Sequence, residues 1–113
     1  MQSTLIIGRF RPDVPSAEAE VAGLFEAFDR TDMPHRMGTR RRELFTFHGL
    51  YVHMQDFDDG TNNSKQILDA RTDARFVQIS ADLKAFLEAY DPATWRSPAD
   101  AMANRFYHWE AQG

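Results

Sequence analysis

Two of the four histidines of this 113-residue chain, His48 and His53, could together bind a metal ion. His48 and His53 fall on one face of a hairpin that the surrounding sequence predicts, and Asp29 or His108 would have to supply a third ligand. Metal ions such as zinc accept imidazole and carboxylate ligands, but no fixed ligand spacing accompanies this pair. We favour the alternative, in which both histidines are partly exposed and hydrogen-bond to neighbouring polar groups.

Arg40, Arg41 and Arg42 form a short basic run that could contact phosphate groups. Consecutive side chains on a strand point to opposite faces, so the run is not a continuous basic stripe. Arg40 and Arg42 would share the face that carries His53, whereas Arg41 would point toward the helix side of the sheet. A solvated charge run is the default interpretation of such residues.

Asp29 is the carboxylate that stands out, because it ends a predicted helix. A negative charge there meets the unfavourable end of the helix dipole. The following loop must return to the strand that bears Arg42, which would bring Asp29 to the rim of the sheet. The alternative role is that of a helix-ending aspartate that begins an ordinary turn.

Several kinds of active site are excluded by what the chain lacks. It has no cysteine, which excludes a disulfide, a thiol nucleophile, a thiolate zinc site and a cysteine-bound iron–sulfur cluster. Its six glycines are scattered, so it has neither a phosphate-binding loop nor a dinucleotide fingerprint. The G-x-S-x-G and H-E-x-x-H motifs are also absent.

Length and charge narrow the class of protein. The 113 residues predict one domain, 1–113, and the 42% hydrophobic and 27% charged residues are typical of a globular chain. With 13 Lys and Arg against 17 Asp and Glu, the net charge of −4 argues against a nucleic-acid partner. Neither a signal peptide nor an apolar stretch of about 20 residues is present, so we expect a cytoplasmic protein without a membrane partner.

The candidate residues are positioned by a predicted pattern of strands and helices. Residues 3–10 predict a strand, and a helix with Ser16 as its N-cap should follow and end near Arg30. The stripe of that helix consists of Val21, Leu24, Phe25 and Phe28. A second helix is predicted between Phe76 and Tyr90, and residues 104–111 predict the last strand.

Between Thr39 and Gln55 the apolar pattern has a period of two, which predicts a hairpin with a type II′ turn at Gly49 and Leu50. One face would be apolar, and we expect it to be the core face: Phe45, Phe47, Val52 and Met54. The other face would be aromatic and basic, and we expect no helix to cover it: Arg40, Arg42, Leu44, Thr46, His48, Tyr51, His53 and Gln55.

The order strand, helix, strand, strand, helix, strand is the βαββαβ pattern of a ferredoxin-like α+β sandwich. Its antiparallel sheet would carry both helices on one face. The aromatic surface of the other face needs a cover. Either a second copy packs against it, sheet to sheet, as in a dimeric α+β barrel, or the face forms the wall of a pocket.

Two segments carry a resemblance to a known family. Residues 28–54, FDRTDMPHRMGTRRRELFTFHGLYVHM, resemble the central motif of the tetracenomycin-type aromatic polyketide cyclases. Residues 90–111, YDPATWRSPADAMANRFYHWEA, are similar to the end of the same family. The likeness extends from the first strand to the last, and the central motif is long and ungapped, which makes it more specific than the shorter patterns above.

The resemblance implies a homodimer joined through its sheets, with a cavity in each subunit and no metal or organic cofactor. It implies a poly-β-ketone or partly cyclised substrate from a type II pathway, either free or presented by an acyl carrier protein. The functional residues at matching positions are Asp29, Arg42 and His53. We also expect three residues to bind substrate: Arg40, Tyr51 and Trp109.

These residue types suit ring closure of a poly-β-ketone. A methylene between two ketones must lose a proton, and a carboxylate or an imidazole can accept it. A guanidinium stays charged at neutral pH, so Arg42 suits the enolate or the alkoxide that forms. We therefore expect Asp29 and His53 to act as the acid–base pair, in roles that the sequence leaves unassigned between them.

One position departs from the family. Relatives often carry His or Ser directly before the aspartate, whereas this chain has Phe28, which completes the helix stripe and is expected in the core.

Three other functions stay open: a cofactor-independent oxygenase acting on anthrones, a dimer that steers a polyketide without catalysis, and a plain dimerisation module. An arginine beside a histidine on an interface argues against the last, because unpaired cations are costly to bury.

Overall fold

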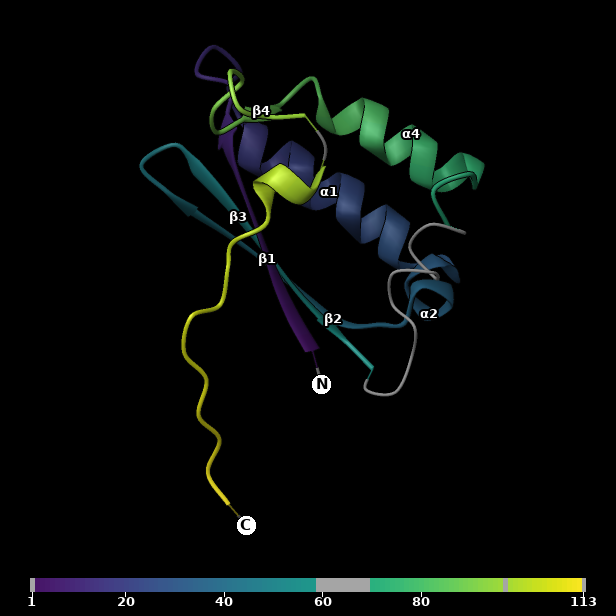
Figure 1. Ribbon diagram of the computed structural model, residues 1–113. Coiled ribbons are helices and arrows are strands. Elements are labelled where there is room, and N and C mark those ends of the chain that lie inside the picture. The colour runs from purple at the N-terminus through teal and green to yellow at the C-terminus, as the bar shows by residue number, and fades with distance from the viewer. Residues whose placement is uncertain (1, 59–69, 97, 113) are drawn as a thin grey trace.

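A four-stranded antiparallel sheet with the strand order β2-β3-β1-β4 forms one layer of the molecule, and helices form the other (Figure 1). The computed structural model describes residues 2–58, 70–96 and 98–112. The strands are β1 (Gln2–Phe10), β2 (Thr39–Phe47), β3 (Leu50–Phe57) and β4 (Leu87–Ala89). The helices are α1 (Ala17–Asp29), α2 (Met33–Met37), α4 (Ala74–Leu83) and the 3-10 turn η1 (Pro98–Ala101).

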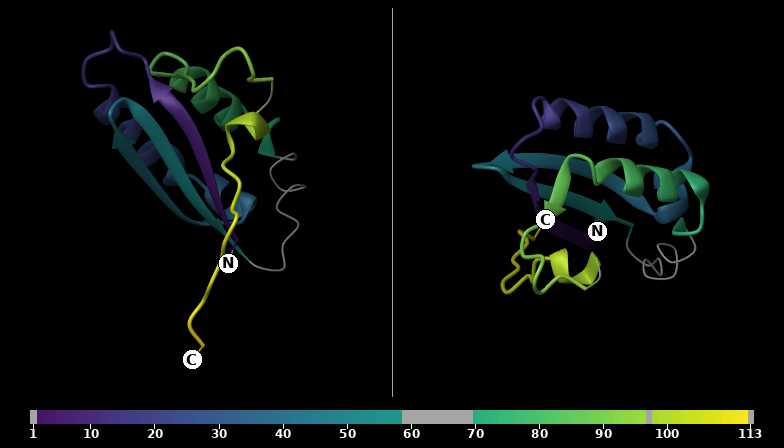
Figure 2. Two further views of the ribbon diagram at one scale, coloured as in Figure 1. Left: turned by 60° about the vertical axis from the view of Figure 1, so that its left-hand side comes forward. Right: turned by 90° about the horizontal axis from the view of Figure 1, so that it is seen from above.

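The two long helices lie on the same face of the sheet, as the view from above shows (Figure 2). This arrangement confirms the predicted α+β class and its antiparallel sheet with helices on one face. Within the described residues, no helix has the length and apolar character that crossing a membrane requires.

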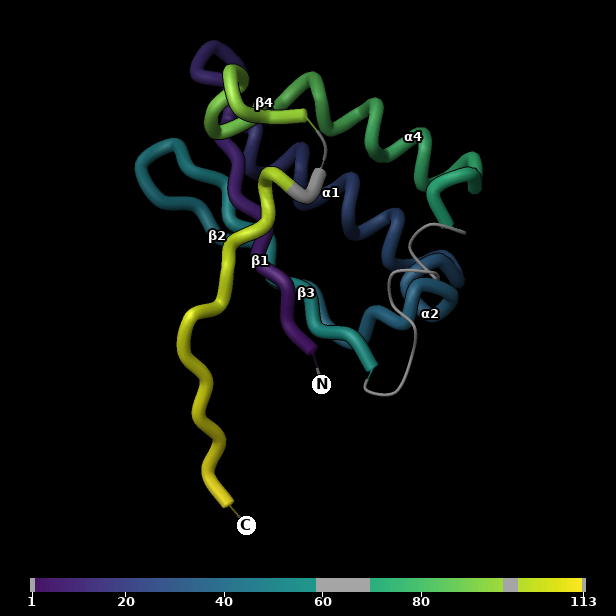
Figure 3. The backbone as a smooth tube through the Cα atoms, viewed as in Figure 1, coloured from purple at the N-terminus to yellow at the C-terminus, as the bar shows by residue number. Residues whose placement is uncertain are grey.

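The last strand of the pattern lies elsewhere than predicted. The helix α4 ends at Leu83, earlier than the predicted helix between Phe76 and Tyr90. The strand β4 occupies part of that predicted helix and pairs with Gly8–Phe10. Residues 104–111, predicted as the last strand, are neither helix nor strand and extend away from the body of the molecule (Figures 1 and 3). Within the described part of the chain no strand pairs with this segment, so the prediction of a last strand there was wrong.

The hairpin also turns at a different place. His48 and Gly49 occupy the turn with φ values of 49° and 80°, and Phe47 pairs with Leu50. Two central residues with positive φ are characteristic of a type I′ turn, so the predicted type II′ turn was wrong. The pairing differs from the predicted one by two residues, so the side chains of residues 41–47 keep their predicted alternation. A register shift between Thr39 and Arg41 interrupts the alternation at Arg40, which we predicted on the same face as Arg42.

The helices cover the opposite face from the one that we predicted. Tyr51, His53 and Gln55 are buried beneath them, whereas Phe45 and Phe47 on the other face are 50% and 67% exposed. Aromatic rings of α1 pack over the polar residues of the covered face. Because these rings offer no hydrogen-bond partners, the buried polar groups form hydrogen bonds with one another. Arg41 also points the other way and forms an ion pair with Asp56, at 3.1 Å.

The first helix carries the predicted stripe into the core. Val21, Phe25 and Phe28 are buried, which confirms the core position expected for Phe28. The helix ends at Asp29 as expected, but Ser16 has a φ of 60° and its side chain caps nothing. The short helix α2, which we did not predict, then returns the chain to β2 with Met33 fully buried.

Candidate active site

Four side chains on the covered face form a continuous hydrogen-bonded chain that runs from Asp29 to Tyr51. Both carboxylate oxygens of Asp29 accept from Arg42, at 3.0 and 3.2 Å from Nε and 2.9 Å from Nη2. The Nη1 atom of Arg42 lies 2.9 Å from Nε2 of His53. The Nδ1 atom of His53 lies 3.0 Å from the hydroxyl of Tyr51. The structure thus brings together four of the six residues that we predicted for the site.

The secondary structure explains how these residues meet. Arg42 and Leu44 alternate onto the covered face of β2, and Leu44 pairs directly with His53 on β3. Tyr51 and His53 are two residues apart on β3, so they share that face. Asp29 arrives from the end of α1, which lies over this part of the sheet.

Aromatic rings from α1 enclose the centre of this chain. The guanidinium carbon of Arg42 lies 4.7 Å from the centre of the Phe25 ring and 5.8 Å from that of Phe28. The Phe25 ring also packs edge-on against His53, with ring centres 5.1 Å apart. Phe28 therefore does structural work where relatives often carry His or Ser, and it supports Arg42 through its ring face.

The ion pair at one end is only half-buried. The Arg42 side chain is 7% exposed, whereas that of Asp29 is 36% exposed. A buried guanidinium needs a partner that compensates for its lost hydration, and the two-pronged pairing with Asp29 provides this compensation. The carboxylate remains accessible from solvent, so a bound molecule could reach it.

His53 is held neutral in this surround. Burial, with the nearby Arg42 charge as a second cause, lowers the pKa of His53 to about 3. Desolvation disfavours the imidazolium, and a like charge within hydrogen-bonding distance disfavours it further. His53 therefore carries no charge near neutral pH.

Tyr51 also stays neutral. Burial raises the pKa of the Tyr51 hydroxyl above its ordinary value, although the charge of Arg42 acts in the opposite direction. Its ring packs edge-on against Phe10, with ring centres 5.8 Å apart. The Tyr51 hydroxyl is thus neutral, and its ring is held in place by Phe10.

A cavity of about 230 Å³ lies beside this chain, between α1 and β2. Of the four site residues, Tyr51 is the one that lines it. The other lining residues are Phe10, Glu18, Val21, Ala22, Leu44, Phe45 and Thr46. Most of this lining is apolar, as in sites for small organic molecules.

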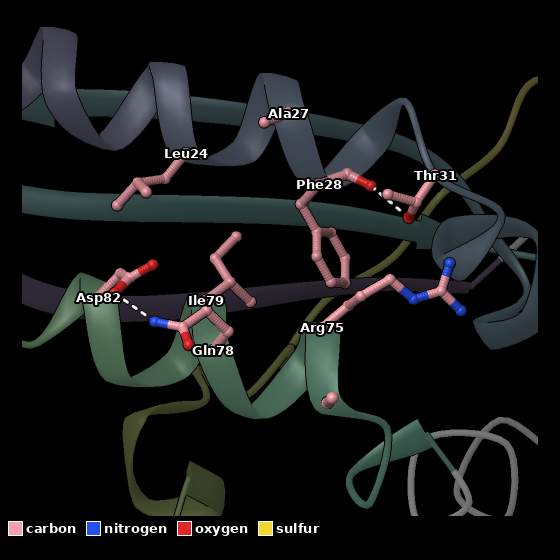
Figure 4. A pocket seen from close by; sticks show the side chains of 9 residues that line it. Leu24, Ala27, Phe28, Thr31, Arg75, Gln78, Ile79 and Asp82 are labelled. Atoms are coloured by element: carbon pink, nitrogen blue, oxygen red, sulfur yellow. Dashed lines mark hydrogen bonds between the residues drawn. The ribbon is translucent and has the colours of Figure 1, made fainter.

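A larger cavity of about 420 Å³ lies between α1 and α4 (Figure 4). It is an open groove that contains none of the four site residues. Arg75 borders it, but Asp73 and Asp32 already pair with this guanidinium, at 3.1 and 2.5 Å. We therefore place the chemistry beside the smaller cavity, which the hydrogen-bonded chain reaches through Tyr51.

Two predicted substrate-binding residues lie away from the site. Arg40 is exposed and pairs with Asp58 at 3.3 Å. Trp109 is 71% exposed in the extended segment that follows η1. Among the described residues, no group of three or more His, Asp or Glu side chains could hold a metal ion.

Phe25 is the site residue that sequence analysis did not single out. It lies four residues before Asp29 on the same helix, so one turn of helix separates the two side chains. This spacing was a usable signal, but Phe25 also belongs to the apolar stripe, and the stripe alone accounts for its type.

Comparisons with known proteins show which family the chain belongs to. The family model described as "Polyketide synthesis cyclase" matches residues 2–110. An uncharacterized protein of Streptomyces coelicolor is 40% identical over 111 residues, covering 97% of this chain and 96% of that protein. Polyketide synthase CurG of Streptomyces cyaneus is 38% identical over 110 residues, covering 97% and 98%.

A solved structure extends the likeness to three dimensions. Tetracenomycin F2 cyclase of Streptomyces glaucescens is 33% identical over 97 residues, covering 86% of each chain. Its structure, described as that of a type II polyketide cyclase, superposes with a TM-score of 0.83 over 99% of this chain and 100% of that chain. The sequence motif, the fold and these relatives agree, and the chain belongs to the polyketide synthesis cyclase family and has the role of a polyketide cyclase.

Proposed function

We propose that the protein catalyses an intramolecular aldol ring closure, followed by loss of water, in a poly-β-ketone or a partly cyclised intermediate. The observation that carries this proposal is the hydrogen-bonded chain from Asp29 through Arg42 and His53 to Tyr51, which lines a largely apolar cavity. It joins an accessible carboxylate, a buried cation and a neutral imidazole. Enolate chemistry needs a base, a group that binds an oxyanion, and a second proton-transfer group.

In the proposed reaction, Asp29 takes a proton from a methylene that lies between two ketones. Arg42 donates hydrogen bonds to the enolate oxygen that forms. The enolate carbon then attacks a second ketone carbon, and the resulting alkoxide takes up the proton that Asp29 holds and becomes a hydroxyl. Loss of this hydroxyl with a neighbouring hydrogen, together as one water molecule, leaves the double bond of the new ring.

His53 is the second proton-transfer group in this proposal. Its Nε2 lone pair accepts from Arg42 while no substrate is present. When Arg42 directs that hydrogen to a substrate oxygen instead, the lone pair becomes free to accept a proton. Hydrogen bonds of unliganded active sites commonly rearrange in this way when the reactants bind.

The cavity supports selection of one ring closure among several. Its volume of about 230 Å³ is below the ~300–1,000 Å³ typical of sites that enclose a whole small-molecule ligand. We expect it to hold the part of the chain that forms the ring, while the rest of the substrate lies outside. Fixing the two reacting carbons in this way excludes competing closures.

The proposal includes a homodimer that works in the cytoplasm, with substrate that is free or presented by an acyl carrier protein. The uncovered sheet face exposes Leu5, Phe45 and Phe47, and the extended segment exposes Phe106 and Trp109. Apolar surface of this kind is typical of an interface, and a second copy packed sheet to sheet would cover it.

A product analysis tests the proposed function. A type II polyketide synthase reconstitution would be run with and without the protein, with mass spectrometry of the products and a parallel record of oxygen uptake. We expect a new product that differs by loss of water, without oxygen uptake. A product heavier by oxygen with matching uptake would instead indicate an oxygenase, and an unchanged product profile would contradict catalysis on that substrate.

A further inference from the structure

We propose that the Tyr51 hydroxyl donates a hydrogen bond to the substrate oxygen that becomes negatively charged, and that His53 holds Tyr51 in this donor role. The proposal rests on the proposed function and adds a catalytic residue to it. It follows from the direction of each hydrogen bond in the chain from Arg42 to Tyr51.

The first step concerns Arg42 and His53. A guanidinium has five N–H donors and no acceptor, so the 2.9 Å contact between Nη1 and Nε2 has Arg42 as its donor. Nε2 must therefore present its lone pair. Since His53 is neutral, its single ring hydrogen has to be on Nδ1.

The second step concerns His53 and Tyr51. Nδ1 carries the hydrogen, so it donates to the Tyr51 oxygen across their 3.0 Å contact. The hydroxyl oxygen accepts, and its own hydrogen is left for another partner. Among the residues that the structure describes, His53 is the only hydrogen-bond partner of this hydroxyl.

The third step concerns what this hydrogen can reach. Tyr51 lines the cavity between α1 and β2, and Phe10 fixes its ring from the side. Of the other lining residues, Val21, Ala22 and Leu44 are apolar, and the oxygen-bearing side chains of Glu18 and Thr46 form no hydrogen bond with the Tyr51 hydroxyl. A substrate oxygen in the cavity would thus meet an O–H donor whose ring is already held in place, which is the arrangement that stabilises a developing oxyanion.

The alternative role for Tyr51 is that of an ordinary buried tyrosine. In that case its hydroxyl would simply satisfy His53, and it could as well donate to Nδ1. The contact with Arg42 excludes that direction, because it reserves the Nε2 lone pair and leaves Nδ1 as a donor. Two donors, Arg42 and Tyr51, therefore flank His53 from opposite sides.

Nuclear magnetic resonance tests the hydrogen-bond direction without any substrate. In the full-length protein labelled with ¹⁵N, long-range ¹H–¹⁵N correlations distinguish the two neutral tautomers, and His53→Gln identifies the signals. We expect the hydrogen on Nδ1 near neutral pH. A hydrogen on Nε2 would overturn the proposal, whatever the protein does to polyketides.

The activity test uses Tyr51→Phe, with Tyr90→Phe as the matched control. Tyr90 lies outside the site, with its ring against Arg9. Loss of one oxyanion donor typically lowers turnover about 10²-fold or more, so we expect such a fall in kcat with little change in KM for Tyr51→Phe alone. Thermal unfolding of both variants checks that they are folded at the assay temperature.

Each outcome of the activity test decides the matter. Active wild-type protein with an unaffected Tyr51→Phe variant would overturn the role of Tyr51 and leave the proposed function standing. Wild-type protein that forms no cyclised product would overturn the proposed function and, with it, this role. A rise in KM without a fall in kcat would assign Tyr51 to uniform substrate binding and would also overturn the proposal.

Discussion

Asp29 and Arg42 form a two-pronged ion pair that joins the end of α1 to the sheet, with Nη2 of Arg42 2.9 Å from Oδ1 of Asp29. This pair explains why an aspartate occupies the unfavourable end of a helix dipole. The Arg42 guanidinium carries a full positive charge in direct contact with the carboxylate, whereas the helix end carries only a partial negative charge. Within the described residues, Asp29 is the only carboxylate that pairs with Arg42. The site thus depends on a residue that is poorly placed for the helix and well placed for the sheet.

Replacement of Arg42 is expected to abolish most of the activity. Arg42→Ala removes the proposed oxyanion donor and should lower cyclisation by at least ~10²-fold. Arg40→Ala, two residues earlier on β2 and paired with Asp58 at the surface, is the control and should retain the wild-type rate. Product formation would be followed by mass spectrometry, and full cyclisation by folded Arg42→Ala would refute the role of Arg42.

Replacement of Asp29 tests the proposed base. Asp29→Asn keeps the size of the side chain but removes the proton acceptor, so we expect a ~10²–10⁴-fold loss of rate. Glu26→Gln on the same helix removes a carboxylate that pairs with Arg30 at the surface, and its rate should be unchanged. Equal rates for Asp29→Asn and Glu26→Gln would show that Asp29 is not the base.

The neutral state of His53 predicts how stability changes with pH. The pKa of His53 is lowered to about 3, so between about pH 6.5 and 3 the unfolded chain binds a proton at this residue that the folded chain does not. The free energy of unfolding should therefore fall as the pH falls, by up to ~1.4 kcal/mol per pH unit from this residue. The Tyr51 hydroxyl, which faces His53, stays neutral throughout this range.

Urea unfolding of the wild type and of His53→Gln at about pH 7, 6 and 5 measures this dependence, at one protein concentration because a dimer would respond to mass action. At each lower pH, the free energy of unfolding of the wild type should fall by more than that of His53→Gln. A difference that stays constant or shifts in favour of the wild type would contradict a neutral, buried His53.

The uncovered face of the sheet predicts an effect on association. Phe47→Glu places a charge in the surface that we expect to be covered by a second copy, so it should convert a dimer to a monomer in sedimentation measurements. Val77→Glu is the control, because Val77 is similarly exposed but lies on α4 in the other layer. Dimers for both variants, or monomers for the wild type, would argue against the sheet-to-sheet dimer.

The sequence predicted which residues share a face, but not which face the helices cover. Alternation along β2 and β3 places Arg42 with Leu44, and His53 with Tyr51, whatever the turn, because a two-residue shift of the pairing preserves the faces. Alternation has no information on where a helix packs. We took the face with Phe45 and Phe47 for the core because it is more apolar, whereas rings from α1 supply the apolar surround of the polar face.

The site itself was predictable in part. Asp29, Arg42, His53 and Tyr51 were named from the sequence, and they meet. Their order along the hydrogen-bonded chain was not predictable, because it depends on how closely side chains from three different elements approach one another. The predicted strand at 104–111 shows a different limit, since an alternating pattern does not show whether a neighbouring strand pairs with it.

The four linked residues of the site come from a contiguous stretch, 29–53, whereas the centre of the sheet joins chain segments that are far apart. The strand β1 pairs with β3 so that Gln2 meets Phe57, while β2 and β3 meet through the turn at His48 and Gly49. Closing the shorter loop costs less entropy, so we expect the hairpin to form before β1 is added.

This order is accessible to kinetics. Gly49 has a φ of 80°, so Gly49→Ala should destabilise the protein by roughly 1 kcal/mol and slow folding, whereas Gly23→Ala on α1 should stabilise by about 0.5–1 kcal/mol. If Gly49→Ala accelerated unfolding and left the folding rate unchanged, the turn would form late. An early hairpin would mean that Arg42, Tyr51 and His53 already share one small scaffold when β1 and the helices pack around them.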